Sequence, residues 1–102
     1  MAPPVQYVSP SEIRHRFNEG RYSERLQEGE FVAEVTIVRP APTRFARGTT
    51  SQMVTYRDHA GRTVAIVHQY GDALGNPARG TLPDPKYLFD GATRYKVSRL
   101  SG

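Results

Sequence analysis

Helical spacing of apolar residues is confined to the first 30 positions, and the later apolar segments alternate with period two. Ile13 and Phe17 lie four residues apart, which places them on one face of a helix. Because the helical period does not return after residue 30, the β–α–β repeats of a Rossmann fold are excluded. This order predicts an α+β fold, with one or two short N-terminal helices packed on an antiparallel sheet of four to five strands.

Two helix starts and stops can be placed from local signals. Ser9 can cap the first helix, Pro10 suits its first position, and Glu12 completes a capping box. Gly20 is expected to end this helix. A second short helix is expected over residues 23–28.

Residues 30–39 predict the first long strand. Its alternate side chains Phe31, Ala33, Val35 and Ile37 form one apolar face, which is expected to belong to the core. Further strands are expected over 52–58, 62–70, 87–89 and 92–97.

Asp90-Gly91 stands between the last two of these segments. Asp-Gly between strands is typical of a two-residue type I′ turn, in which both central residues have positive φ. Gly91 is therefore expected in the left-handed region.

The chain of 102 residues is long enough for one core only, so residues 1–102 are expected to form a single domain. Within it, residues 1–8 are expected to be an N-terminal arm, and residues 98–102 a tail. Segments 40–51 and 71–86 are expected to be long loops, since they are rich in Gly and Pro or lack periodicity.

Composition excludes several classes of function. The chain has no cysteine, which excludes a disulfide scaffold, a zinc ribbon and a thiol nucleophile. His and Asp residues show no recognised ligand spacing, so we expect no metal site and no cofactor. No apolar run reaches about 18 residues, so no membrane association is expected.

Positive charge is concentrated in two blocks. The net charge is +4, and residues 39–62 hold five Arg against one Asp, while residues 86–102 hold four basic residues against one Asp. Neighbouring strands would bring these blocks together, and the predicted binding residues are Arg57, Arg62, Arg94 and Lys96. Such a patch suits nucleic acid or an acidic host protein as partner. The alternative is that the Arg excess only reflects a GC-rich coding bias.

A general acid–base site is the second hypothesis. His68 and Tyr70 stand at the end of a predicted strand, and Lys86 follows the long loop that returns to the sheet. A His with nearby cations could take a proton from an RNA 2′-hydroxyl and stabilise the phosphorane without a metal. Under this hypothesis, the catalytic residues of a metal-independent ribonuclease toxin would be His68, Tyr70 and Lys86.

The segment from Val67 to Val97 combines His68-Gln69-Tyr70, Asp84-Pro85-Lys86, Asp90-Gly91 and Tyr95. This pattern resembles one in small uncharacterised proteins of actinobacteria and their phages. The resemblance implies a phage or mobile-element context, in the host cytoplasm or a virion, and transfers no activity.

The favoured hypothesis is a small basic accessory protein that binds a host protein or nucleic acid through an Arg-rich sheet face or its long loops. Such a protein need not be an enzyme. A virion structural component is the third alternative. The sequence leaves open whether the chain forms homo-oligomers.

Overall fold

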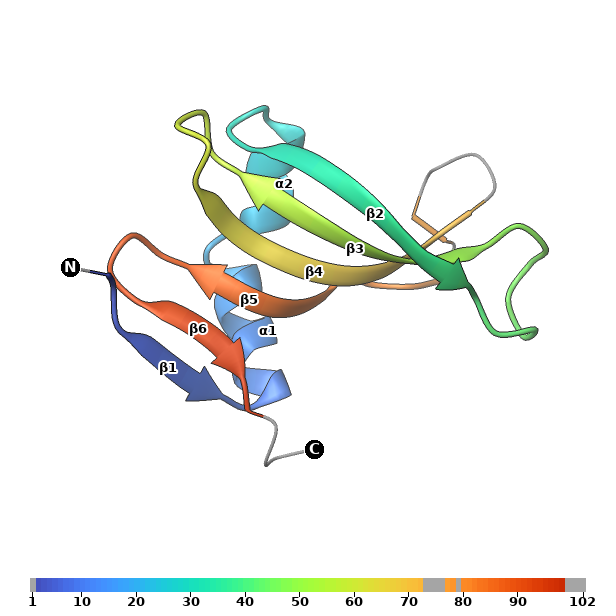
Figure 1. Cartoon of the computed structure of the whole chain (residues 1–102), viewed down its shortest axis with the longest axis horizontal. Helices are drawn as coiled ribbons and strands as arrows, with labels where there is room; N and C mark the ends of the chain where they lie inside the picture. The colour runs from blue at the N-terminus through green and yellow to red at the C-terminus, as the bar shows by residue number, and fades with distance from the viewer. Residues whose placement is uncertain (1, 73–76, 79, 99–102) are drawn as a thin grey trace.

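Two helices and one six-stranded sheet make up the α+β fold (Figure 1). The computed structural model describes residues 2–72, 77–78 and 80–98. The elements in chain order are β1 (Val5–Val8), α1 (Pro10–Glu19), α2 (Tyr22–Gln27), β2 (Val32–Pro40), β3 (Thr50–Arg57), β4 (Thr63–Gly71), β5 (Asp84–Phe89) and β6 (Arg94–Val97). The strand order is β1-β6-β5-β4-β3-β2.

The α+β class is confirmed, but the sheet is mixed and has six strands rather than four or five. The extra strand is β1, which lies in the segment expected to be an N-terminal arm, and it pairs in parallel with β6. The Arg94 amide donates to the Pro4 carbonyl at 2.9 Å, and the Ser98 amide donates to the Val8 carbonyl at 2.8 Å. The prediction missed β1 because its parallel partner lies near the other end of the chain, so no adjacent segment marks the pairing.

Both predicted helices are present. The Ser9 hydroxyl accepts the Glu12 amide at 3.1 Å, as expected for the N-cap of α1. At the other end of α1, the Gly20 amide donates to the Arg16 carbonyl at 2.9 Å. The second helix begins at Tyr22, one residue earlier than expected.

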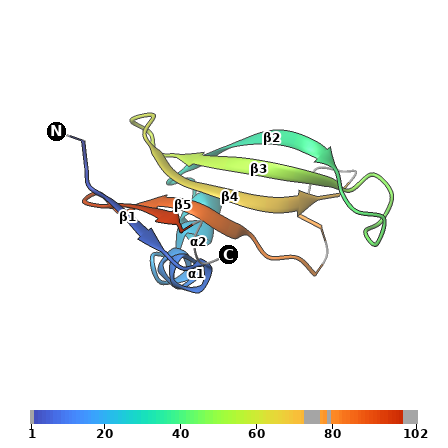
Figure 2. The same cartoon turned by 60° about the horizontal axis from the view of Figure 1, so that its bottom comes forward.

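The helices cover one face of the sheet (Figure 2). On the opposite face, which we call the open face, none of the described residues forms a helix. Ile13 and Phe17 of α1 are buried against the sheet. The strand residues in this core are Val8, Val54, Tyr56, Val64, Ala65, Val67, Leu88 and Tyr95. Burial of apolar surface on this side stabilises the fold and leaves the open face exposed to solvent.

The predicted core face of the first long strand is wrong. Phe31 is buried beside Tyr22, but Val35 and Ile37 are 51% and 64% exposed. The reason is position, because β2 is the edge strand of the sheet and pairs only with β3 among the described elements. The far ends of β2, β3 and β4 extend beyond the helices (Figure 2).

Gly91 has a φ of 99°, so its predicted left-handed conformation is confirmed. The predicted type I′ turn is wrong, because the connection has four residues, 90–93, and Asp90 does not have a positive φ. The Asp90 carboxylate instead accepts the amides of Ala92 and Thr93, each at 2.8 Å. This Asx turn replaces the two-residue turn.

The expected long loops are shorter than their predicted ranges. Residues 40, 50 and 51 belong to strands β2 and β3, and β5 already begins at Asp84. Residues 73–76 and 79 of the second loop, and residues 99–102 of the tail, lie outside the described residues. Among the residues that are described, no helix is long and apolar enough to span a membrane.

Two leucines give a matched test of which side chains form the core. Leu88 is 1% exposed and Leu82 is 82% exposed. We expect Leu88→Ala to lower the free energy of unfolding by about 2–5 kcal/mol, because it leaves a cavity in the core. Leu82→Ala should change it by less than about 0.5 kcal/mol. Urea unfolding followed by circular dichroism measures both, and equal losses would contradict this assignment of the core.

Candidate functional site

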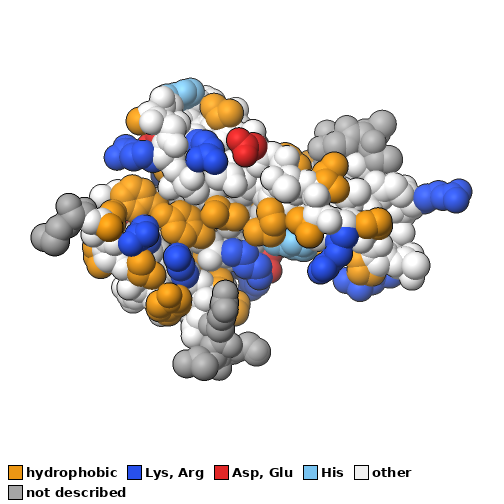
Figure 3. Space-filling model, in the orientation of Figure 1, with side chains coloured by type: hydrophobic (Ala, Val, Ile, Leu, Met, Phe, Trp, Pro, Cys, Tyr) orange, Lys and Arg blue, Asp and Glu red, His pale blue; other side chains and the backbone are white. Residues whose placement is uncertain are grey.

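A broad groove crosses the open face at the end of the sheet that holds β1, β6, β5 and β4. Its volume is about 1130 Å³. The groove is lined by Tyr7, Met53, Thr63, Ile66, Lys86, Tyr87, Arg94, Lys96, Val97 and Ser98. Figure 3 views the open face, where basic side chains stand among apolar ones.

One row of side chains crosses this groove from strand to strand. Tyr7 of β1 pairs in register with Lys96 of β6, and Lys96 pairs with Tyr87 of β5. Tyr87 in turn pairs with Ile66 of β4. Residues that are directly opposite in a sheet project from the same face, so a cation stands between two aromatic rings. Tyr7 is 65% exposed, which leaves its ring available to a ligand.

Three cations line the groove, and none of its lining side chains is acidic. The guanidinium group of Arg94 donates to the Pro3 carbonyl at 2.9 and 3.2 Å, which fixes it to the N-terminal segment. The ammonium group of Lys86 lies 2.9 Å from the Asp84 carboxylate at the start of β5. Lys96 lies two residues after Arg94 on β6, so both project from the open face.

Burial raises the pKa of the Tyr87 phenol above its ordinary value, and the nearby charge of Arg94 partly opposes this shift. The Tyr87 ring therefore stays neutral throughout the physiological pH range. A neutral ring beside cations can contact an apolar or aromatic ligand surface without adding a negative charge to the groove.

The structure brings together two of the four predicted binding residues, Arg94 and Lys96, in the groove. Arg57 lies at the margin of the groove and is not one of its lining residues. Its guanidinium donates to the hydroxyl of the lining residue Thr63 at 3.0 Å and lies 4.0 Å from the Glu34 carboxylate. Arg62 does not join them. It lies in the β3–β4 turn, where its guanidinium pairs with Asp58 at 2.9 Å.

Sequence reasoning missed Tyr7, because residues 1–8 were expected to be an arm. Among the strand tyrosines, Tyr87 faces the groove, whereas Tyr56 and Tyr95 are buried on the helix side. The signal that could have found Tyr7 is the short run Val5–Val8, in which an aromatic and two valines occupy four positions.

His68 also belongs to the open face, and in register it opposes Met53 on one side and Asp84 on the other. Its Nε2 atom lies 2.7 Å from the Ser51 hydroxyl, and its ring meets the Tyr70 ring edge-on at 4.9 Å. Ser51 is buried, so a Ser–His pair that attacks a substrate does not fit this geometry.

Of the other two proposed catalytic residues, Tyr70 contacts the His68 ring, and Lys86 approaches it only through Asp84, which opposes His68 in register. Tyr70 stacks on Phe45 with ring centroids 4.3 Å apart, and Lys86 is paired with Asp84. Within the part of the chain that the structure describes, no three His, Asp or Glu side chains gather as metal ligands.

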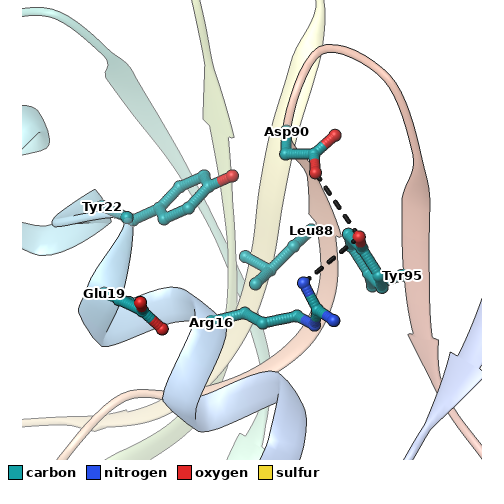
Figure 4. Close-up of a pocket in the computed structure, with 7 residues that line it drawn as sticks. Arg16, Glu19, Tyr22, Leu88, Asp90 and Tyr95 are labelled. Carbon is teal, nitrogen blue, oxygen red and sulfur yellow. Dashed lines mark hydrogen bonds between the residues drawn. The ribbon is translucent and has the colours of Figure 1, made fainter.

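A second polar cluster lies on the helix side, in a cavity of about 290 Å³ between α1, β5 and β6 (Figure 4). The Arg16 guanidinium lies 4.2 Å from the centre of the Tyr95 ring and donates to its hydroxyl at 3.2 Å. Arg16 also pairs with Glu12 at 3.1 Å. The Tyr95 hydroxyl donates to Asp90 at 3.5 Å. Because these groups bond to one another, the cluster braces α1 against the sheet.

Comparison of the chain with protein families, with curated proteins and with solved structures gives no match.

Asp90 gives a pH-dependent test of the Asx turn. The amide of Thr93 donates to its carboxylate and holds its pKa below the ordinary value, with a further contribution from the Ala92 amide. A carboxyl pKa that is lowered on folding adds stability above the unfolded pKa, and this stability is lost as the pH falls through the folded pKa. We expect Asp90→Asn to weaken the acid dependence of the free energy of unfolding.

Urea unfolding at a series of pH values between neutral and strongly acidic measures this dependence. Asp58, whose pKa the Arg62 amide lowers, retains its own contribution, so the dependence should shrink and not vanish. An unchanged pH profile in Asp90→Asn would show that the turn does not lower the pKa of the Asp90 carboxyl.

Proposed function

We propose that the protein is a small basic binding protein and that its groove binds single-stranded nucleic acid. The observation that carries this proposal is the row Tyr7–Lys96–Tyr87 on three adjacent strands of the open face. Aromatic rings stack on unpaired bases, and cations beside them bind the phosphates of the same strand.

The charge of the groove supports an anionic ligand. Lys86, Arg94 and Lys96 line it without an acidic neighbour among the lining residues. The Arg94 guanidinium is held by the Pro3 carbonyl, so part of the entropic cost of fixing this side chain is already met in the free protein. A pre-oriented guanidinium suits a phosphate oxygen, because its donors match the phosphate geometry.

The shape of the groove favours a single strand over a duplex. The open face is a sheet surface, and within the described part of the chain no helix or ribbon projects from it to enter a major groove. In a duplex the bases are stacked on one another, so Tyr7 and Tyr87 would have no free base to contact. A single strand offers both phosphates and base faces.

Salt dependence measures the phosphate contacts. With a labelled single-stranded oligonucleotide, we expect a log–log slope of affinity against salt of about −2, from three phosphate contacts at roughly 0.7 each. Lys96→Gln should reduce the slope to about −1.4 and weaken binding to all sequences alike. Fluorescence anisotropy at several salt concentrations gives both values.

Arg62→Gln is the matched control, because it removes one charge from the β3–β4 turn, where Arg62 is paired with Asp58. It should leave slope and affinity nearly unchanged. Equal effects of the two substitutions would mean that only the net charge matters. No binding of any single-stranded oligonucleotide at low salt would overturn the proposal and leave an acidic protein as the partner.

Stacking is tested separately from charge. Tyr7→Ala should weaken oligonucleotide binding by about five- to 150-fold, which corresponds to the 1–3 kcal/mol of one stacked base. The salt slope should not change, since no cation is removed. Tyr7→Phe retains the ring and should bind like the unmodified protein. A loss in Tyr7→Phe equal to that in Tyr7→Ala would assign the effect to the hydroxyl group instead.

RNA cleavage is a second candidate, because His68 lies on the same face as the groove and opposes its lining residue Met53. Ser51 occupies the Nε2 atom, so the Nδ1 atom would have to accept the 2′-hydroxyl proton. Under this hypothesis His68→Ala lowers cleavage of a labelled RNA by at least about a hundredfold in excess chelator. Intact RNA after prolonged incubation with the unmodified protein would exclude it.

A further inference from the structure

The strand β2 lies at one edge of the sheet and is exposed, so a second strand could pair with it. Its residues are exposed from end to end, and four large apolar side chains on it are more than half exposed. These side chains are Val32, Val35, Ile37 and Val38. A long exposed apolar edge favours pairing with another strand, and natural edges usually carry Lys or inward-pointing charges against it. β2 has no lysine.

A β-bulge makes this edge symmetrical. Ile37 pairs with Gln52 and Arg39 pairs with Ser51, so Val38 is the extra residue and has no partner on β3. The steps of the ladder therefore run through Glu34, Val35, Thr36, Ile37 and Arg39. Thr36 is the middle residue of these five. Val35 and Ile37 are one step away on either side, and two steps away the acidic Glu34 stands on one side and the basic Arg39 on the other.

The faces of the sheet agree with this symmetry. Glu34 opposes Thr55 and Arg39 opposes Ser51, and both of these β3 residues lie on the open face. Val35 opposes the core residue Val54, so Val35 and Ile37 project from the helix side. Antiparallel pairing about Thr36 thus brings like faces together.

We propose that β2 pairs with the β2 strand of a second copy of this chain, antiparallel and centred on Thr36. The two strands place Thr36 opposite the partner's Thr36, Val35 opposite the partner's Ile37, and Glu34 opposite the partner's Arg39. Each apolar contact and each ion pair occurs twice, because the pairing is two-fold symmetric. The result is one continuous sheet of twelve strands with both open faces on the same side.

Charge complementarity selects this occupant over an unrelated strand. Glu34 lies 4.0 Å from Arg57 of its own chain, a long contact that leaves its carboxylate exposed. Arg39 makes no ion pair within the described part of the chain. A second copy supplies the opposite charge at both positions in one register, and opposite charges directly across a sheet are stabilising. Self-pairing does not depend on nucleic-acid binding, since it uses the other end of the sheet.

Cysteine cross-linking tests the register directly, because the natural chain contains no cysteine. Opposed Cα atoms in an antiparallel pair are about 4.5–5.5 Å apart, which is within disulfide range. We expect Thr36→Cys to form a covalent dimer on mild oxidation. In the matched control Val32→Cys, the two sulfur-bearing positions would be about 26 Å apart, from eight steps of roughly 3.3 Å. This control should stay monomeric on a non-reducing gel.

Sedimentation velocity then tests the charges. We expect a concentration-dependent dimer that Glu34→Arg weakens by at least about tenfold, because two pairs of like charges then face each other. The swap Glu34→Arg/Arg39→Glu should restore the dimer, although Arg57 still faces an arginine within each chain. Glu28→Arg has the same charge change on an exposed residue outside β2 and should leave the dimer intact.

Two results would overturn self-pairing. One is a monomer at every concentration, which would leave β2 to a strand of a different protein. The other is equal cross-linking of both cysteine variants, which would indicate random collision. A thermal melt of each variant by circular dichroism ensures that any loss of dimer is not a loss of fold.

Discussion

Ile13 and Phe17 of α1 are buried against the centre of the sheet, and the rest of the structure depends on this contact. A domain of 102 residues has apolar side chains for one such layer only. The helix side therefore becomes the core, and the other side of the sheet remains open. Arg16, on the same helix, donates to Glu12 and to Tyr95 of β6, so it links the helix to the sheet.

The two ends of this sheet expose different kinds of side chain. At the end near β1, the open face carries Lys86, Arg94 and Lys96 between aromatic rings. At the other end, β2 exposes valine and isoleucine side chains with Glu34 and Arg39 among them. Charge concentrated over one end favours an extended anion, whereas a bare strand edge favours another strand.

The features that depend on residues adjacent in the chain were predicted from the sequence. The caps of α1, the period-two strands and the left-handed Gly91 follow from residues that are neighbours in the chain, and so does the common face of Arg94 and Lys96. The predictions that were wrong or incomplete concern residues whose surroundings are set by segments distant in sequence. Ile37 has the pattern of a core residue, but its strand is an edge that no helix reaches. Arg62 lies in the β3–β4 turn, and Tyr7 belongs to a strand whose partner lies near the other end of the chain.

The parallel pairing of β1 with β6 sets an order on how the domain is completed during synthesis. Strands β2 to β5 can pair hairpin by hairpin as they leave the ribosome, but Val5 has to wait for Arg94. Until then β1 has no ladder partner, and Tyr7 has no Lys96 beside it. A chain interrupted before β6 would contain most of the sheet but would lack the groove-lining residues of β6. The groove is thus completed last, and only in a chain that has been translated through β6.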